Sequence, residues 1–524
     1  MTKLSTLAPG DWVTAHSRRQ PDHACVVTPE RTFSYAEVNR RATRLAHGLR
    51  ELGIAHGDRI TIMSTDSADY VHLVLASMKL GSIALPMNFR LSPSELATVL
   101  ASAAPALHVA SPRYAGSLDA ARSVSPRLKS TLMLDCDRAG ADATVGEVAG
   151  SGAGEAELVS ATGEEDILFL MLTSGTTGTP KMVMQSQRMV RAVAYSGVYE
   201  QRLRAGDFMY SGAPLFHVAG LGHVMYALAC GGSSLILPQW EADTALHWLQ
   251  YGDLNHCMLV PSMAMSLLEH PRIRDVGYPR LRSIMFGGAP MPPALMRQMY
   301  DVFGSDLYNA FGSTQVGGQT VFNADDHKRA IDGEERLLGS IGRPVMGTDI
   351  RIRDEDGNDV ALGDVGEIWT RSESVFSGYL DQPELTAATV VDGWYRSGDL
   401  GHMTADGYVF LGGRSDDMII RGGENVYPVE IESVLSEHRS VLEAAVIGMD
   451  DEYWGQIVVA AVTTREGSLL TLADMRAHCR ERLASYKVPE RLYLVTEMPR
   501  NSTGKIQKRL LRQMAAANTI AAAD

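Results

Sequence analysis

An apolar run at residues 167–172 leads into a loop of glycines and small hydroxyl residues, and this junction constrains the fold more than any other segment. Glycines let a backbone turn sharply and approach a ligand closely. Backbone N–H groups and threonine hydroxyls then surround a polyphosphate, and a lysine adds positive charge. The sequence therefore predicts a buried strand that delivers a phosphate-binding loop, formed by Thr173, Ser174, Gly175, Thr176, Thr177, Gly178, Thr179, Pro180 and Lys181.

The spacing within this loop argues against a P-loop NTPase. A Walker A loop requires the pattern G-x-x-x-x-G-K-[ST], whereas Gly178 is followed by Thr179, Pro180 and Lys181. The short motif G-T-T-G by itself also leaves open an ordinary surface turn rich in glycine and threonine.

Length and composition indicate a globular protein of more than one domain. A chain of 524 residues exceeds what one hydrophobic core usually supports. Its 45% hydrophobic and 21% charged residues are ordinary proportions for such a protein. The net charge of −14 argues against a nucleic-acid partner or an anionic membrane surface, so an anionic substrate must be met by local positive charge.

The cysteines and the apolar runs predict a cytoplasmic protein without a membrane span. The five cysteines are odd in number and form no C-x-x-C pair, which argues against a disulfide framework or a structural zinc site. Residues 1–12 contain no apolar signal segment. No apolar run reaches the length of a transmembrane helix.

The first part of the chain alternates helical and strand patterns, which predicts α/β layering. Ser34 and Glu37 have the spacing of a capping box ahead of an amphipathic helix that Gly53 ends. The pattern further predicts a strand at 59–63, a helix at 70–80 and a second strand at 83–86. The stretch at 140–165, rich in Gly, Ala, Ser and acidic residues, predicts an exposed connection.

A second, smaller unit is predicted from Asp416 onward. Pro428 suits the first position of a helix. Three strands are expected at 444–447, 457–462 and 492–495, and a second helix at 472–484. The last residues, 515–524, are expected to form a frayed helical tail. The fold class predicted is thus α/β, with a large N-terminal α/β region of several subdomains (1–415) and a small α+β C-terminal domain (416–524).

The full run S-G-T-T-G-T-P-K resembles the phosphate loop of the adenylate-forming superfamily, which includes acyl- and aryl-CoA ligases, nonribosomal-peptide adenylation domains and luciferases. Further motifs extend the resemblance over nearly the whole chain. The resemblance implies ATP, Mg²⁺ and coenzyme A as cofactors. It also implies a mobile C-terminal domain that rotates about a hinge near Asp416 between two half-reactions.

The resemblance assigns roles to residues that would otherwise be turns, solvated charges or structural histidines. His217 would border the substrate carboxylate, and Lys505 would insert between that carboxylate and the α-phosphate. Asp399 would bind the ribose hydroxyls, and Arg414 the ribose or the phosphates. Gly288, Ala289 and Pro290 would form the turn that packs against adenine. Gly422 and Gly423 would belong to the loop that lines the pantetheine tunnel.

The motif at 308–315 departs from the family pattern at its last position. Thr314 matches the residue that contacts the α-phosphate, but Gln315 replaces the glutamate that usually helps to hold Mg²⁺. A neutral amide oxygen is a weaker Mg²⁺ ligand than a carboxylate. Thr173 is the other residue expected at the metal. Met182 and Gln187 replace a family glycine and histidine, and we expect them near the acyl or phosphate approach.

The resemblance predicts an ATP-dependent acid:CoA ligase that releases AMP and pyrophosphate. Residues 218–221 carry no phenol or charge, so an aryl, cinnamate-like or medium-chain acid is expected. Two alternatives keep the adenylate chemistry: nitrite-dependent diazotisation of an aromatic amine, and acyl transfer to an amine or a carrier protein. A nucleotide-binding pseudoenzyme is disfavoured because Asp399, Arg414 and Lys505 are present. The sequence leaves open whether the protein forms a homodimer.

Overall fold

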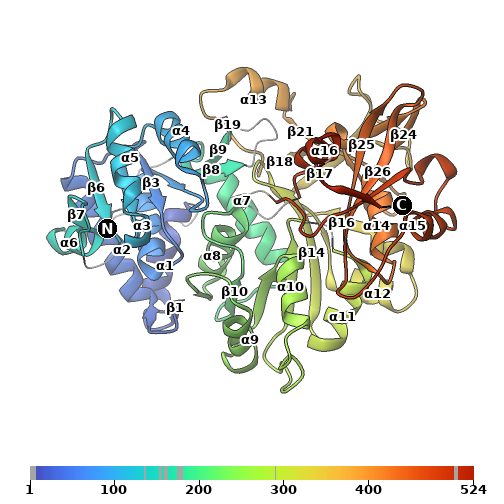
Figure 1. Ribbon diagram of the computed structural model, residues 1–524. Coiled ribbons are helices and arrows are strands. Elements are labelled where there is room, and N and C mark those ends of the chain that lie inside the picture. Colours follow the sequence, from blue (N-terminus) through green and yellow to red (C-terminus); the bar gives the residue numbers. More distant parts are fainter. Residues whose placement is uncertain are drawn as a thin grey trace.

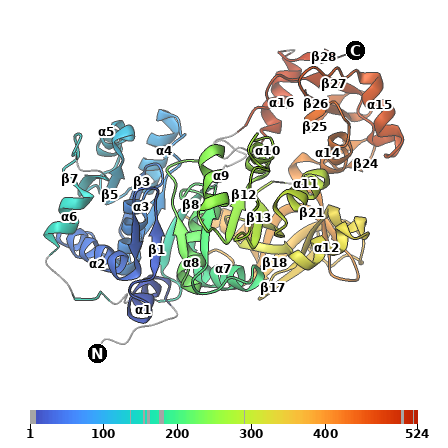
Figure 2. The ribbon, with the colours of Figure 1, turned by 90° about the horizontal axis from the view of Figure 1, so that it is seen from below.

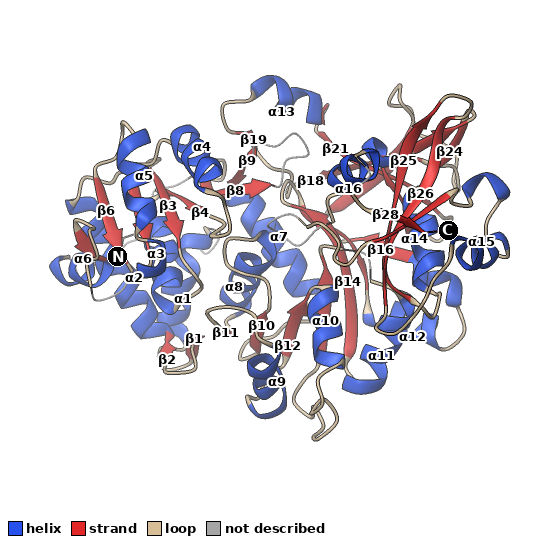
Figure 3. Ribbon diagram, viewed as in Figure 1, coloured by secondary structure: helices blue, strands red, loops and turns tan. Residues whose placement is uncertain are grey.

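A computed structural model describes residues 8–134, 137–152, 156–158, 163–173, 181–289, 291–500, 506–517 and 519–523. Three β-sheets with covering helices organise these residues (Figures 1 and 3). In both views of the ribbon the C-terminal unit lies at the end of the molecule opposite α2 and α6 (Figures 1 and 2). Within the described part of the chain, no helix has both the length and the apolar character needed to cross a membrane.

The first sheet runs β19-β9-β8-β4-β3-β5-β6-β7. Its strands are β3 (Arg59–Met63), β4 (Ile83–Pro86), β5 (Leu107–Ala110), β6 (Ser130–Met133), β7 (Ala143–Thr144), β8 (Ile167–Thr173), β9 (Lys181–Ser186) and β19 (Gly378–Tyr379). The helices of this part of the chain are α1 (Trp12–Arg19), α2 (Tyr35–Glu51), α3 (Ala68–Leu80), α4 (Pro93–Ala103), α5 (Gly116–Val124) and α6 (Val145–Ser151).

Helices cover both faces of the first sheet. Ile60 and Ile62 of β3 belong to a hydrophobic cluster with residues of α2 and α3. Met63 and Leu85 belong to a separate cluster with residues of α4. Because both faces are buried, the strands predicted at 59–63 and 83–86 are mainly apolar, and Thr61 is buried with them.

The second sheet runs β17-β18-β21-β22-β16-β15-β14-β13-β12-β10-β11-β1-β2, with β20 paired to β21. Its strands are β1 (Ala24–Val27), β2 (Thr32–Ser34), β10 (Phe208–Ser211), β11 (Ser233–Leu235), β12 (His256–Leu259), β13 (Ser283–Gly287), β14 (Asp306–Ser313), β15 (Gly317–Phe322), β16 (Ser340–Pro344), β17 (Thr348–Arg353), β18 (Gly366–Ser372), β20 (Val390–Val391), β21 (Trp394–Met403) and β22 (Val409–Arg414). The accompanying helices are α7 (Gln187–Glu200), α8 (Val218–Cys230), α9 (Ala242–Tyr251), α10 (Pro261–Leu268), α11 (Pro293–Phe303), α12 (Ala324–Ile331) and α13 (Pro383–Thr389).

A third sheet forms the C-terminal unit and runs β24-β23-β26-β27-β28, with β25 paired to β26. Its strands are β23 (Ile419–Arg421), β24 (Glu424–Val426), β25 (Val441–Asp451), β26 (Gly455–Thr464), β27 (Arg491–Leu494) and β28 (Ala521–Ala523). Its helices are α14 (Pro428–Ser436), α15 (Leu472–Arg480) and α16 (Lys508–Ala516). Short 3₁₀ helices lie at Pro9–Asp11, Pro112–Tyr114, Glu335–Gly339, Ser415–Asp417 and Ser485–Lys487.

Most of the predicted elements are present. The capping box at Ser34 and Glu37 is formed on both sides, and Pro428 occupies the first position of α14. Two expectations were wrong. The stretch at 140–165 contains β7 and α6, whose own capping box starts at Thr144. The predicted frayed helical tail at 515–524 instead begins at the end of α16 and contains β28, which pairs with β27.

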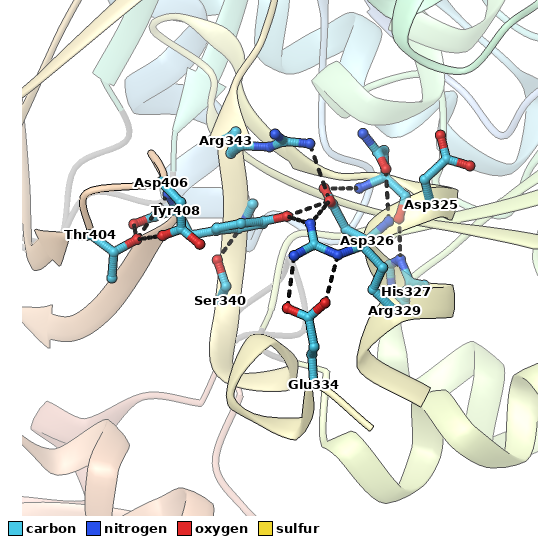
Figure 4. A network of polar contacts seen from close by, with 12 residues as sticks. Asp325, Asp326, His327, Arg329, Glu334, Ser340, Arg343, Thr404, Asp406 and Tyr408 are labelled. Atoms are coloured by element: carbon cyan, nitrogen blue, oxygen red, sulfur yellow. Dashed lines mark hydrogen bonds and ion pairs between the residues drawn. The ribbon is translucent and has the colours of Figure 1, made fainter. Parts of the chain in front are cut away.

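A buried polar network joins α12 to the strands of the second sheet (Figure 4). The Asp326 carboxylate is 1% exposed and accepts hydrogen bonds from the Tyr408 hydroxyl at 2.5 Å and from Arg343 at 3.2 Å. Arg329 donates to the Tyr408 oxygen at 2.8 Å and pairs with Glu334. Because Tyr408 directly precedes β22, this network fixes the strand that carries Arg414.

Candidate nucleotide and acyl site

Four predicted site residues follow parallel strands of one sheet. Strands β10, β12, β13 and β14 are parallel neighbours, so their carboxyl ends lie along a single edge. His217 follows β10, Gly288 and Ala289 follow β13, and Thr314 follows β14. Ligands of α/β proteins bind at the carboxyl ends of such strands. The fold therefore gathers residues that lie far apart in the sequence along one edge.

The predicted phosphate loop connects two hydrogen-bonded strands, β8 and β9. Thr173 ends β8 and is the register partner of Lys181, which begins β9. The Thr173 hydroxyl donates to the Lys181 carbonyl at 3.5 Å. The connecting residues lie outside the described part of the chain; they are Ser174, Gly175, Thr176, Thr177, Gly178, Thr179 and Pro180. The antiparallel pair brings the two ends of the loop together.

Tyr379 is the point where two predicted site residues meet. The Lys181 ammonium lies 5.6 Å from the centre of the Tyr379 ring, and the Gln315 side-chain amide donates to the Tyr379 hydroxyl at 2.9 Å. Tyr379 is 5% exposed, because β19 pairs with β9. The sequence interpretation missed Tyr379, since no local pattern places a residue of a two-residue strand against a loop about 200 positions earlier.

The turn that carries Thr314 is held from two sides. The Gln185 side chain of β9 donates to the Thr314 carbonyl at 2.9 Å. The Phe376 backbone N–H donates to the Gln315 carbonyl at 2.8 Å. Gln185, also missed from the sequence, thereby links the strand after the phosphate loop to the predicted α-phosphate residue.

Asp399 and Arg414 form an ion pair across neighbouring strands. They are register partners in β21 and β22, and Arg414 Nη1 lies 3.2 Å from Asp399 Oδ1 and 2.8 Å from the Ser397 carbonyl. Gly398 has φ +69°, and a Cβ there would lie 3.0 Å from Arg414 Nη2. The positive φ favours glycine at this position. The result is a carboxylate and a guanidinium presented together, a donor and acceptor set suited to a ribose phosphate.

The turn after β13 allows a close approach to its backbone. Gly288 has φ +80°, which favours glycine, and Ala289 is exposed. A Cβ at Gly287 would lie 2.6 Å from the Ala310 carbonyl oxygen, so small residues are needed here. Pro290, the last residue of the predicted adenine turn, lies outside the described residues.

His217 is the N-cap of α8, and its Nδ1 accepts a hydrogen bond from the Ala219 N–H at 3.2 Å. The loop before it is held by Asp66, whose two carboxylate oxygens each lie 3.1 Å from the Leu215 N–H. Burial raises the pKa of Asp66 to about 8, although the Leu215 hydrogen bond acts in the opposite direction. Asp66 follows β3 of the first sheet, so sequence spacing could not connect it to His217.

The residues expected around Mg²⁺ provide neutral oxygens. Among the described residues, no three His, Cys, Asp or Glu side chains are grouped so that they could hold a metal ion. Thr173 contributes a hydroxyl, and Gln315 an amide whose nitrogen is directed to Tyr379. Such a donor set fits an Mg²⁺ that is carried mainly by phosphates and water, which is how this ion usually binds with nucleotides.

The remaining predicted residues belong to the C-terminal unit. Gly422 and Gly423 form the turn between β23 and β24 with φ +58° and +90°. Lys505 lies outside the described residues. The predicted hinge position falls in the short 3₁₀ helix between β22 and β23. Met182, which follows Lys181 in β9, is buried in a hydrophobic cluster of the first sheet.

Family comparisons agree with this arrangement of residues. The model of the AMP-binding enzyme family matches residues 13–380, and that of the AMP-binding enzyme C-terminal domain matches residues 430–505. The chain belongs to the AMP-binding enzyme family. Indoleacetate–CoA ligase of Aromatoleum aromaticum is 32% identical over 511 residues, which cover 97% of this chain and 98% of that relative.

Solved structures of AMP-binding enzymes share the complete fold. ATP-bound MatB from Rhodopseudomonas palustris has a TM-score of 0.88 at 29% identity, covering 96% of this chain and 98% of its own. The amide bond synthetase McbA from Marinactinospora thermotolerans has a TM-score of 0.88 at 27% identity, covering 97% and 99%. The predicted fold class, a large α/β region with a separate C-terminal domain, is confirmed. The chain is an adenylate-forming ligase of this family.

Proposed function

We propose that this AMP-binding enzyme uses ATP to activate an aryl, cinnamate-like or medium-chain carboxylic acid that carries no second charged group. It then transfers the acyl group to coenzyme A. The observation that carries the proposal is the shared edge of β10, β13 and β14, where His217, Gly288 and Thr314 follow the strand ends. The indoleacetate–CoA ligase, whose name specifies an aryl acid, supports the acid class.

The first half-reaction joins the acid to AMP. A carboxylate oxygen forms a bond to the α-phosphorus, the bond from this phosphorus to the bridging oxygen breaks, and pyrophosphate leaves. The enzyme needs no covalent nucleophile, because catalysis consists of positioning the reactants and stabilising phosphate charge. His217 would border the carboxylate, and Thr314 and Lys505 would contact the α-phosphate side. Asp399 and Arg414 would hold the ribose.

Bound Mg²⁺ would supply neutralisation of phosphate charge, and Thr173 and Gln315 are the residues that would hold it. The loop from Thr173 to Lys181 would surround the polyphosphate with N–H groups, hydroxyls and one ammonium. These assignments account for the lack of a carboxylate ligand at position 315.

The second half-reaction releases AMP. The thiol sulfur of coenzyme A attacks the acyl carbon, the bond from that carbon to the AMP oxygen breaks, and the thiol proton passes to solvent. Gly422 and Gly423 would then line the pantetheine tunnel in place of Lys505. The C-terminal unit would rotate about position 416 between the two steps.

A different acceptor is the second candidate. The structure of McbA, an amide bond synthetase by its title, matches this chain with the same TM-score as MatB. An amine in place of the thiol would attack the same acyl carbon and leave the adenylation residues unchanged. Gln315 is a departure from the family pattern that would accommodate such altered chemistry.

Pyrophosphate release tests both candidates. The enzyme is incubated with ATP, Mg²⁺ and a panel of acids, alone and with coenzyme A, with primary amines, or with nitrite and an aryl amine. Acid-dependent pyrophosphate release and a thioester that forms only with coenzyme A are expected. An amide product without thioester would support the second candidate, and nitrite-dependent turnover would support diazotisation. No pyrophosphate release with any acid would contradict the proposal.

A further inference from the structure

Strand β21 carries a β-bulge directly before Leu400. Glu367 of β18 is the register partner of Leu400, and Trp369 is the register partner of Arg396. Two positions along β18 therefore correspond to four positions along β21, and the extra residues lie at 397–399. A bulge interrupts the hydrogen-bond ladder and re-aims the side chains that it carries. The carboxylate predicted to bind the ribose is one of these side chains.

Side chains satisfy the backbone of this bulge. The Ser397 carbonyl accepts from Arg414 Nη1 at 2.8 Å, and the Asp399 N–H donates to the Ser397 hydroxyl at 2.9 Å. The Gly398 N–H donates to Glu367 Oε1 at 3.0 Å. Because a backbone donor that leaves the strand ladder needs another partner, the Glu367 carboxylate replaces the missing ladder bond.

The Glu367 carboxylate is itself fixed by two neighbours. Arg396 donates to Glu367 Oε2 through Nη2 at 2.9 Å and through Nε at 3.1 Å. Trp369 Nε1 donates to the same oxygen at 3.0 Å. The side chain is only 14% exposed, and hydrogen bonds to a charged group are stronger than neutral ones. These bonds orient the carboxylate so that Oε1 is directed to the bulge.

A stack of guanidinium groups and indole rings supports these neighbours. The Arg353 guanidinium lies 4.7 and 4.6 Å from the ring centres of Trp369 and Trp394. Arg396 lies 5.1 Å from the ring centre of Trp369, and Arg371 lies 4.6 Å from that of Trp394. Both rings are at most 7% exposed. Cation–π contacts with buried rings restrict the side chains that take part, so the donors to the carboxylate are held in place.

The bulge holds both members of the predicted ribose pair. Asp399 belongs to it, and Arg414 donates to its Ser397 carbonyl as well as pairing with Asp399 at 3.2 Å. A shift of the bulge would therefore move the carboxylate and the guanidinium together. Both oxygens of Glu367 are engaged by the protein, so this residue acts through Asp399 and not on the nucleotide itself.

We infer that Glu367 is a positioning residue for the nucleotide ribose. It holds the bulge of β21 so that the Asp399 carboxylate can accept from both ribose hydroxyls, and the enzyme thereby selects ribonucleotides over deoxyribonucleotides. This inference rests on the proposed function, which assigns Asp399 to the ribose. It extends that function by a residue of the neighbouring strand.

A nucleotide without the two hydroxyls measures this role. The readout is the ratio of kcat/KM for ATP over 2′,3′-dideoxy-ATP, obtained from pyrophosphate release with one acid. Two hydrogen bonds to a charged group are expected to give a ratio of about 100 in the original enzyme. Glu367→Ala should lower this ratio to about 1–3, as Asp399→Ala should, because the carboxylate no longer meets the hydroxyls. The KM of the acid should stay unchanged.

A double variant and a matched control separate positioning from a general loss of stability. If Glu367 acts through Asp399, the double alanine variant should have the same ratio as Asp399→Ala alone. Asp349→Ala is the control. Asp349 also pairs with two arginines, Arg351 at 3.6 Å and Arg371 at 3.3 Å, but it lies on β17, which β18 separates from β21. Its ratio should equal that of the original enzyme.

Glu367→Gln is the milder change, for the case that the alanine variant does not fold. Its single amide oxygen cannot accept from Gly398, Arg396 and Trp369 together, so the ratio should fall about 10-fold. An unchanged ratio in every folded variant of Glu367, with a lowered ratio in Asp399→Ala, would overturn the inference alone. An equal fall in Asp349→Ala, or a further fall in the double variant, would also overturn it.

Failure of the proposed function gives a different result. An unchanged ratio in Asp399→Ala would overturn the ribose assignment and this inference with it. If no acid releases pyrophosphate from the original enzyme, the proposed activity fails by itself. The same ratio is then taken from the dissociation constants of ATP and 2′,3′-dideoxy-ATP, measured by calorimetry. Equal ratios in the original protein and the folded Glu367 variants would overturn the inference, and a lowered ratio in those variants would support it.

Discussion

Lys181, which the sequence assigned to the phosphates, and Gln315, which it assigned to Mg²⁺, contact the same side chain. Lys181 lies over the ring of Tyr379, and the Gln315 amide donates to its hydroxyl. The glutamine nitrogen is thus engaged by the protein, which leaves the amide oxygen as the group that can face a cation. This orientation explains how a neutral residue can occupy the usual position of a glutamate.

Replacement of Gln315 by glutamate tests this arrangement. A carboxylate binds Mg²⁺ more strongly than an amide oxygen, so Gln315→Glu should lower the Mg²⁺ concentration needed for half-maximal pyrophosphate release. The Tyr379 hydroxyl can donate to the new carboxylate, so the fold should be retained. A Mg²⁺ titration of both proteins checks the expectation, with Gln315→Ala as control. Identical titration midpoints for the glutamate variant and the original enzyme would show that position 315 does not reach the metal.

Asp66 makes stability depend on pH. Its pKa is raised from 3.8 to about 8 by burial, so between these values the folded state binds a proton that the unfolded state does not. The free energy of unfolding should therefore fall as the pH rises from about 4 to 8, by up to about 1.4 kcal/mol per pH unit. Asp66→Asn should remove this contribution.

Denaturant unfolding at several pH values measures the effect. The difference in unfolding free energy between the original protein and Asp66→Asn should change steadily across this interval and level off above pH 8. A pH-independent difference would mean that Asp66 stays ionised, and that its bond to Leu215 alone holds the loop before His217.

At the scale of elements, the strand that presents Arg414 depends on a residue just outside it. Tyr408 is 1% exposed and precedes β22, and its hydroxyl donates to the buried Asp326 carboxylate of α12 (Figure 4). The Arg329 and Arg343 guanidinium groups lie 6.0 and 5.0 Å from the Tyr408 ring centre. This network joins a helix to the neighbouring strands β21 and β22, which carry Asp399 and Arg414.

Tyr408→Phe should destabilise the protein by about 1–3 kcal/mol, because Asp326 would lose a donor while remaining buried. Tyr453→Phe is a matched control, since Tyr453 is 82% exposed and its hydroxyl should contribute little. Unfolding by denaturant gives both values. Equal stability of the two variants would exclude the Tyr408 hydroxyl as an anchor of β22. The ATP concentration for half-maximal activity should also rise in Tyr408→Phe.

At the scale of the whole molecule, the C-terminal unit is tied to the rest at the short 3₁₀ helix Ser415–Asp417. The Ser415 hydroxyl donates to the Gly398 carbonyl at 3.2 Å, next to Asp399. The Asp417 carboxylate pairs with Arg512 of α16 at 2.8 Å. One end of this connection thus contacts the predicted ribose site, and the other contacts the C-terminal unit.

Asp416→Pro should separate the two half-reactions. Proline fixes φ near −65° and removes the backbone donor, which restricts rotation about this position. Adenylate formation should continue, while thioester formation from added acyl-adenylate should fall strongly. Single-turnover measurements of each step check this, with Asp416→Ala as control. Full rates in both steps for the proline variant would place the hinge elsewhere.

Lys505→Ala should slow the first half-reaction and leave the second nearly unchanged, which is the opposite of the effect expected for Asp416→Pro. Loss of one group that stabilises developing charge typically costs about 10²–10³-fold in rate, so adenylate formation should slow by at least this factor. Thioester formation from presynthesised adenylate should change little. An equal loss in both steps would remove the assigned role.

The sequence by itself determined the local structure and the identity of most candidate residues. Capping at Ser34 and the helix start at Pro428 follow from spacing and side-chain type, because they depend on contacts within a few residues. The strands at 59–63 and 83–86 follow from their short, mainly apolar runs, although their hydrogen bonds are made with strands that are distant in the sequence. The motifs around Thr173, Thr314 and Asp399 are likewise short and contiguous.

Only the tertiary structure decided which of these residues meet. Strand β19 places Tyr379 against Lys181, β9 places Gln185 under Thr314, and the loop after β3 brings Asp66 to Leu215. Strand order and register set these contacts between positions that lie tens to hundreds of residues apart. Packing and pairing between distant elements are cooperative properties of the folded chain, and no local pattern encodes them.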